Sequence, residues 1–214
     1  MKTKSLKIVF VIDESGSMQS SSSDVIGGFN GFVERQKAEN PGEISVSLFK
    51  FNDTVTQVIV NKPAAEIRHL TAADYDPNGF TALYDAIGEA IHETDKQLSV
   101  MEEKERPDKV MVVIITDGED NASKEFSAKA IKSSISTHEE LLNWTFIFMG
   151  SGLDSFKDAE ALGIDNRANA PAWKLKSNIN HVAESSINFC MFDEKDDKGI
   201  VDNLMSELND QDSK

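Results

Sequence analysis

Apolar and polar positions form two kinds of pattern along this chain, short apolar runs and longer stretches with helical spacing. Leu6–Ile12 is apolar almost throughout, as in a parallel strand covered on both faces. Val110–Ile115 is the most apolar β-rich run and predicts the central strand. Ile44–Phe51 and Thr54–Val60 alternate in polarity around Asn52-Asp53, which predicts a hairpin with one antiparallel edge strand.

Stretches with helical spacing separate these runs. They predict helices after the capping residues 20–24, over about 81–104, and around 126–135, 156–162 and 175–190, with one more strand at 144–149. Residues 164–170 fit either a loop or an edge strand. Such alternation predicts an α/β fold, a doubly wound and mostly parallel central sheet with one antiparallel edge strand and helices on both faces, similar to a Rossmann fold.

The C-terminal end of the chain has a different composition. Residues 193–214 are acidic and contain no aromatic residue, so we expect a domain over residues 1–192 followed by an acidic tail. Ile200, Leu204 and Leu208 fall at helical spacing within this tail. They fit either a short amphipathic helix that docks on the domain or on a partner, or a frayed, solvated terminus.

Charge and cysteine content narrow the class of protein. The chain has 214 residues and a net charge of −15, so its surface repels phosphate, and neither nucleic acid nor an anionic membrane is an expected partner. Cys190 is the only cysteine, which excludes an internal disulfide. No apolar stretch approaches the ~20 residues of a membrane span, and the run after Lys7 is too short for a signal peptide. We therefore expect a cytoplasmic protein.

Oxygen-bearing side chains follow two predicted strands and precede one helix. Asp13, Ser15 and Ser17 come directly after the first strand, Asp117 follows the central strand, and Thr81 stands where a loop enters the second long helix. Ligands of doubly wound sheets bind outside the carboxyl ends of the strands, so we expect these residues at one edge. Carboxylates and hydroxyls are hard donors that suit magnesium or manganese better than zinc or copper.

Each of these residues also has a purely structural interpretation. Residues 13–17 fit an ordinary strand-to-helix turn, since Asp, Ser and Gly are common turn and capping residues. Thr81 fits the N-cap of its helix, and Asp117 fits a turn before Gly118.

Three acidic residues lie beside the candidate donors in the sequence. Glu14, Glu119 and Asp120 are interpreted as solvated loop acids that tune specificity.

Three glycines lie within the first long helical stretch, at positions 27, 28 and 31. Each costs about 1 kcal/mol of helix stability against alanine, so they predict a close approach of the helix to the sheet.

The order and spacing of the three motifs resemble the von Willebrand factor type A domain family. Asp13-x-Ser15-x-Ser17, Thr81 and Asp117-Gly118 match the family's metal-ion-dependent adhesion site. Residues 13–18 and the Gly-Phe-Asn at 28–30 are most similar to its soluble bacterial or phage-encoded branch. The resemblance implies that the hydroxyls of Ser15, Ser17 and Thr81 bind the ion directly, and that Asp13 and Asp117 bind it directly or through water.

The same resemblance implies a function. The expected cofactor is Mg²⁺, with Mn²⁺ or Ca²⁺ as alternatives, and the expected partner is a protein whose exposed Asp or Glu fills the sixth coordination position. We therefore expect a non-enzymatic protein-binding module of an intracellular bacterial or phage complex, for which stress response is one setting.

Three alternatives remain at this stage. An aspartate-dependent phosphohydrolase would need a second carboxylate at position 15, where the chain has Ser15. A structural scaffold would carry a metal site without a binding function. Self-association would place acidic residues of one molecule's tail in the site of another.

Overall fold

The computed structural model describes residues 4–39, 43–150, 152–169, 171–191 and 197–209. Within these ranges the elements follow one another in this order: β1 (Ser5–Asp13), η1 (Gly16–Ser21), α1 (Ser22–Glu39), β2 (Glu43–Phe51), β3 (Val55–Pro63), η2 (Ala64–Glu66), α2 (Leu83–Ser99), η3 (Glu103–Glu105), β4 (Lys109–Thr116), α3 (Ala128–Leu142), β5 (Thr145–Gly150), α4 (Gly152–Ala161), β6 (Arg167–Asn169), α5 (Ala172–Met191) and α6 (Asp197–Asn209). None of the helices described is both long and apolar enough to cross a bilayer.

The strands form a single six-stranded sheet in the order β3-β2-β1-β4-β5-β6. Every neighbouring pair is parallel except β2 and β3, which form the expected antiparallel hairpin at one edge. β1 and β4 lie side by side in the middle, and β4 is buried along its whole length. The predicted fold class is therefore confirmed, and the stretch that fitted a loop or a strand contains the short parallel strand β6.

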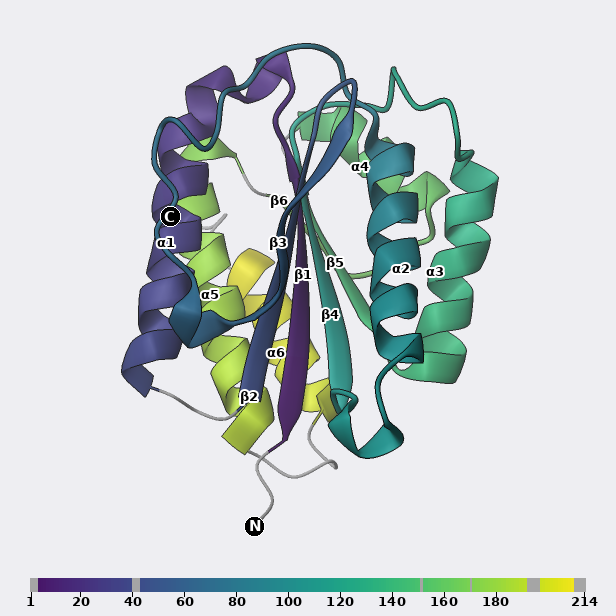
Figure 1. Cartoon of the computed structure of the whole chain (residues 1–214). Helices are drawn as coiled ribbons and strands as arrows, with labels where there is room; N and C mark the ends of the chain where they lie inside the picture. The colour runs from purple at the N-terminus through teal and green to yellow at the C-terminus, as the bar shows by residue number, and fades with distance from the viewer. Residues whose placement is uncertain (1–3, 40–42, 151, 170, 192–196, 210–214) are drawn as a thin grey trace.

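Helices cover both faces of the sheet (Figure 1). α1, α5 and α6 lie on one face and α2, α3 and α4 on the other. Alternate residues of β1 serve the two cores: Ile8 and Phe10 pack towards α1 and α5, whereas Val9 and Val11 pack towards α2. A strand buried on both faces explains the nearly continuous apolar run in the sequence.

Two predicted features differ from the structure. The helix predicted to reach residue 104 ends at Ser99, and a separate 3-10 turn covers Glu103–Glu105. The glycines of α1 approach a helix and not the sheet, because an added Cβ at Gly28 would lie 2.7 Å from Ile179 of α5 and one at Gly31 would lie 2.8 Å from Asn180. The sequence Asn40-Pro41-Gly42 predicts the end of this first long helix, and these residues lie outside the described ones.

The tail contains a docked helix. Ile200, Leu204 and Leu208 of α6 are buried in the same core as α1 and α5. Asn209 Nδ2 donates a hydrogen bond of 3.4 Å to the carbonyl oxygen of Arg167 in β6. Over residues 197–209 the interpretation as a frayed terminus is therefore wrong, since the amphipathic face of the helix packs on the domain.

Candidate metal centre

The carboxylate of Asp13 lies at the end of β1 and is fully buried. Its Oδ2 accepts a hydrogen bond of 2.6 Å from Thr116 Oγ1, at the end of the neighbouring strand β4. Its Oδ1 accepts one of 2.7 Å from the backbone N–H of Ser15. The bond from Thr116 follows from the parallel pairing of β1 with β4, which brings the two strand ends level, whereas the bond from Ser15 is local to the loop. Together the two bonds fix the start of the loop after β1.

The hydroxyls of this loop meet the loop after β4. Ser17 Oγ donates a hydrogen bond of 2.5 Å to Asp117 Oδ1, and Ser15 Oγ lies 3.1 Å from Ser17 Oγ. Ser15 is 2% exposed, whereas Ser17 is open to solvent. The predicted residues of the two central strands thus lie together at the carboxyl edge of the sheet.

Thr81 completes the group from a third loop. A Cβ built on Gly118 would lie 3.4 Å from Thr81 Oγ1 and 3.8 Å from Ser17 Oγ, so both hydroxyls face the space that this glycine leaves empty. The N-cap residue of α2 is Ala82, so Thr81 lies one residue before it. The interpretation of Thr81 as the N-cap is therefore wrong, and its hydroxyl is directed towards the other two loops.

Burial changes the acidity of Asp13. Removal from water raises the pKa of its carboxyl group to about 6, and the negative charge of Asp117 contributes in the same direction. The hydrogen bonds from Thr116 and Ser15 oppose this rise, because they stabilise the ionised form. A nearby cation would favour the charged form, so the raised pKa marks a position that positive charge would stabilise.

Glu14 is a structural residue and not the solvated acid that the sequence suggested. Its Oε1 accepts hydrogen bonds of 2.6 Å from Lys50 Nζ and 2.7 Å from the backbone N–H of Asp76. Lys50 Nζ also donates to the carbonyl oxygen of Asp74 at 2.6 Å. Because the Glu14 and Lys50 side chains are only 14% and 15% exposed, this ion pair joins β2 to the loops beside the candidate site.

Asp120 also has a structural role, whereas Glu119 lies at the surface as expected. Asp120 Oδ1 accepts hydrogen bonds from the backbone N–H of Tyr84 at 3.2 Å and from Ser123 Oγ at 2.5 Å. The side chain of Glu119 is 50% exposed and lies 3.4 Å from Lys157 Nζ.

Asp85 is a supporting residue that the sequence reasoning missed. Its carboxylate accepts hydrogen bonds of 2.7 to 2.9 Å from the backbone N–H groups of Lys124, Glu125 and Phe126. The only signal in the sequence is an aspartate in the first turn of a helix, which is common for electrostatic reasons alone. These bonds attach the loop after β4 to α2 and so help to position Asp117.

The donor set fits a hard divalent cation. It contains two carboxylates and three hydroxyls that converge beside a glycine whose missing side chain leaves room. Among the described residues there is no group of three or more His, Cys, Asp or Glu side chains that could hold a metal. The candidate site therefore depends on hydroxyls, a donor type that zinc and copper sites do not favour.

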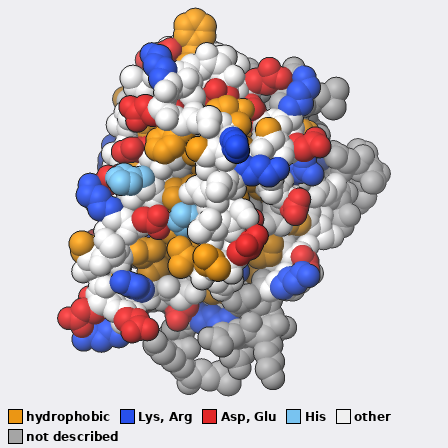
Figure 2. All heavy atoms as spheres, turned by 90° about the vertical axis from the view of Figure 1, so that its right-hand side faces the viewer, with side chains coloured by type: hydrophobic (Ala, Val, Ile, Leu, Met, Phe, Trp, Pro, Cys, Tyr) orange, Lys and Arg blue, Asp and Glu red, His pale blue; other side chains and the backbone are white. Residues whose placement is uncertain are grey.

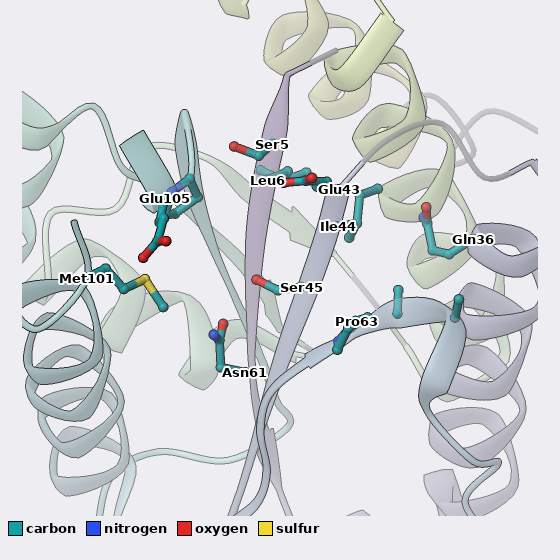
Figure 3. Close-up of a pocket in the computed structure, with 13 residues that line it drawn as sticks. Ser5, Leu6, Gln36, Glu43, Ile44, Ser45, Asn61, Pro63, Met101 and Glu105 are labelled. Carbon is teal, nitrogen blue, oxygen red and sulfur yellow. The ribbon is translucent and has the colours of Figure 1, made fainter. Parts of the chain in front are cut away.

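A cavity of 450 Å³ lies at the other end of the sheet (Figure 3). It is lined by the first residues of β1 and β2, the end of β3, and the segment before β4. Ser45, Asn61, Met101 and Glu105 are among its lining residues, and none of the five candidate donors is. The candidate metal centre is thus an open group of loops and not this cavity.

The fold and the loops at its carboxyl edge define an α/β domain with an oxygen-rich site, and sequence comparison gives its family. The model of the von Willebrand factor type A domain matches residues 7–139, more than half of the chain. The chain belongs to this family. A comparison with curated proteins found no match.

Solved structures share the fold at low sequence identity. A von Willebrand factor type A protein from Catenulispora acidiphila has a TM-score of 0.58 and 17% identity over 86% of this chain and 43% of its own. The open conformation of the pilus adhesin SpaC from Lactobacillus rhamnosus GG has a TM-score of 0.65 and 15% identity over 88% of this chain and 31% of its own. This chain thus spans less than half the length of either protein.

A third structure matches over nearly its full length. The von Willebrand factor domain of the type V pili tip protein Mfa5 from Porphyromonas gingivalis has a TM-score of 0.59 and 10% identity, over 90% of this chain and 98% of its own. These likenesses establish the fold. Domains of this family generally mediate protein–protein interactions, so the family favours a binding role.

Proposed function

We propose that this domain is a Mg²⁺-dependent protein-binding module. Ser15, Ser17 and Thr81 would hold the ion through their hydroxyls, with Asp13 and Asp117 binding it directly or through water. The observation that carries the proposal is the convergence of three loops, in which Ser17 Oγ lies 2.5 Å from Asp117 Oδ1 and faces the same space as Thr81 Oγ1. When bound, Mg²⁺ supplies a positive charge and a coordination position for an anionic oxygen.

The protein's own residues explain why a carboxylate would be the ligand. The three hydroxyls add no negative charge, and Asp13 and Asp117 would neutralise the ion only in part where they bind it through water. Its open side would therefore attract the Asp or Glu of a partner. Asp13 is held by Thr116 and by the N–H of Ser15, which keeps the loop after β1 in place. Ser17 and Asp117 now hydrogen-bond to each other, and both would turn their oxygens to the ion.

Other parts of the assignment remain proposals. Mn²⁺ or Ca²⁺ would fit the same donor types, and the expectation of a cytoplasmic protein of a bacterial or phage complex remains a prediction. Some structural neighbours are pilus proteins, but a likeness at 10 to 15% identity carries only the fold to this chain.

Calorimetric titration with MgCl₂ tests the metal site. We expect the wild type to bind Mg²⁺, and Asp13→Ala and Asp117→Ala to lose measurable binding while keeping their helical circular dichroism. Asp76→Ala is the matched control, because this aspartate is exposed in a neighbouring loop and should leave the affinity unchanged. Equal Mg²⁺ affinity in the wild type and in both site variants would contradict the proposal.

A further inference from the structure

Phe80 is an exposed aromatic residue beside the candidate metal centre. Its side chain is 65% exposed, whereas the adjacent Thr81, whose hydroxyl belongs to the site, is 3% exposed. The other large hydrophobic side chains that are exposed among the described residues lie on β3 or at the ends of α2, α3 and α5. Figure 2 shows a hydrophobic side chain that projects at the top of the molecule, the end at which the candidate site lies.

The backbone around Phe80 is fixed by hydrogen bonds to other loops. The N–H of Asn78 donates to the carbonyl oxygen of Glu14 at 2.9 Å, and the N–H of Phe80 donates to Asp53 Oδ2 at 3.1 Å. On the other side of Phe80, the N–H of Thr81 donates to Asn121 Oδ1 at 2.8 Å. A backbone held in this way loses little conformational entropy when a partner covers the ring.

Gly79 adds a steric reason for this geometry. Its φ of +75° is a conformation that L side chains rarely adopt, and an added Cβ would lie 2.1 Å from Asp53 Oδ2. Its carbonyl oxygen accepts a hydrogen bond of 3.2 Å from the N–H of Gly16, in the loop that carries Ser15 and Ser17. The loop of Phe80 is therefore attached directly to the loop of the candidate ligands.

The charge around the site limits the partner further. Asp53, Asp76 and Glu119 are exposed on loops at this edge, and the chain as a whole has a net charge of −15. A partner segment with several acids would be repelled by this surface. A single carboxylate among neutral or apolar residues would avoid that cost.

We propose that Phe80 is the second contact of the site and selects a partner segment in which an apolar side chain lies within two residues of one isolated Asp or Glu. This inference rests on the proposed function. Phe80 and Thr81 are consecutive, so their Cα atoms lie about 3.8 Å apart, and an extended partner advances about 3.3 Å per residue. The residue next to a bound carboxylate, or the one after it, would therefore reach the Phe80 ring. Burial of an apolar side chain against an exposed aromatic ring favours binding.

Immobilised peptides of known sequence test this inference. Three synthetic octapeptides differ only beside a central Asp, with Leu, Gly or Glu on both sides, and a fourth has Asn in place of the Asp between two Leu residues. Retention of wild type, Phe80→Ala, Asp117→Ala and Val100→Ala would be measured in MgCl₂ and in EDTA. Val100 is the control because it is 83% exposed and lies at the end of α2 that is remote from the site.

We expect the wild type to bind the Leu-flanked Asp peptide about tenfold more tightly than the Gly-flanked peptide, and only in MgCl₂. Phe80→Ala should bind the Leu-flanked and the Gly-flanked Asp peptides equally, with the affinity that the wild type has for the Gly-flanked one. Val100→Ala should behave as the wild type. Equal binding of the two peptides by the wild type, or an unchanged preference in Phe80→Ala, would overturn the role of Phe80 alone. Absence of any Mg²⁺-dependent binding to the Asp peptides would overturn the proposed function and this inference with it.

Discussion

The Ser17 hydroxyl donates a hydrogen bond of 2.5 Å to Asp117 Oδ1 and joins two loops that are 100 residues apart in the sequence. Neither residue is held there by its own loop alone. Ser17 lies in the 3-10 turn after β1, and Asp117 follows β4, so the contact exists because these two strands are neighbours in the sheet. The same bond joins two of the three loops that form the candidate metal centre.

Gly118→Ala should weaken Mg²⁺ binding without unfolding the domain. The new methyl group would lie 3.4 Å from Thr81 Oγ1 and 3.8 Å from Ser17 Oγ, which is ordinary van der Waals contact, but it would occupy the space that these hydroxyls face. We expect Mg²⁺ affinity to fall at least about tenfold, because Mg²⁺ tolerates little departure from ideal geometry. Calorimetric titration measures this. Gly199→Ala is the control, because nothing lies within 4 Å of its added Cβ. Equal Mg²⁺ affinity in the two variants would contradict the claim that the ion occupies the space beside Gly118.

Adjacent glycines of α1 should respond differently to the same substitution. In Gly28→Ala the Cβ would come within 2.7 Å of the Ile179 side chain and 3.2 Å of the Lys176 Cα atom. The Ile179 side chain must then move and the α5 backbone must shift by a few tenths of an ångström, at a cost of roughly 1–3 kcal/mol that the better helix propensity of alanine offsets in part. In Gly27→Ala the nearest atom to the new Cβ is 3.6 Å away, so no clash opposes the substitution. The better helix propensity of alanine should then stabilise the protein by up to about 1 kcal/mol. The urea concentration at the midpoint of unfolding should therefore be higher for Gly27→Ala than for the wild type, and lower for Gly28→Ala. The reverse order would argue against close packing of these helices.

Lys7 should make the stability depend on pH between about 8 and 9. Its ammonium group donates to Ser47, Asn61 and Gln97 at 2.6 to 3.3 Å, and burial lowers its pKa from 10.5 to about 8. Above pH 8 the folded protein therefore binds fewer protons than the unfolded chain, so the free energy of unfolding rises with pH, by about 1 kcal/mol over this interval.

The variant Lys7→Met isolates this effect in urea unfolding at pH 7, 8 and 9. We expect the free energy of unfolding of Lys7→Met not to show this rise between about pH 8 and 9. Lys62 is exposed, so Lys62→Met should show the same rise as the wild type. The thiol of Cys190 ionises near pH 9 in the unfolded chain, whereas burial raises its pKa in the folded protein to about 12. Cys190 therefore lowers the stability as the pH approaches and passes about 9, and it does so equally in the wild type and in Lys7→Met, so the difference between these two proteins reports Lys7 and the comparison stops at about pH 9. Identical pH profiles for the wild type and Lys7→Met would mean that Lys7 is not the source of the dependence.

Leu204→Ala should destabilise the whole domain. Leu204 is fully buried between α6 and the core of α1 and α5, and truncation of such a residue costs about 2–5 kcal/mol. Asn203→Ala changes the neighbouring exposed position and should have little effect on the urea midpoint. If the two variants unfolded at the same urea concentration, α6 would not contribute to the fold.

The fold was predictable because most of its elements have local signals. The continuous apolar runs of β1 and β4 indicate strands covered on both faces, and the alternation in β2 and β3 indicates an edge hairpin. The position of the candidate donors at one edge of the sheet was predictable for the same reason, since each follows a strand or precedes a helix that the pattern identifies, whereas their role as metal ligands stays a prediction.

The features that the sequence did not predict depend on residues far apart along the chain. The glycines of α1 approach α5, about 150 positions later, and no local pattern says which element fills the space beside them. Asp85 and Glu14 look like surface acids until the loops that supply their donors or the Lys50 ammonium are placed beside them. Thr81 has the residue type of an N-cap, but the helix begins after Ala82.

The strand order has a consequence for the folding of the chain. β1, β2 and β3 are consecutive, and they can form contacts before the chain beyond them is in place. A chain with only these three strands would carry Asp13, Ser15 and Ser17 but neither Asp117 nor the β4 edge that supplies Thr116. A cation that needs donors from all three loops would bind only after β4 has inserted beside β1, and it would then stabilise the native state over the partly folded states that lack β4. Under the proposed function, Mg²⁺ would thus bind only to fully folded molecules and not to chains in which β4 has yet to join the sheet.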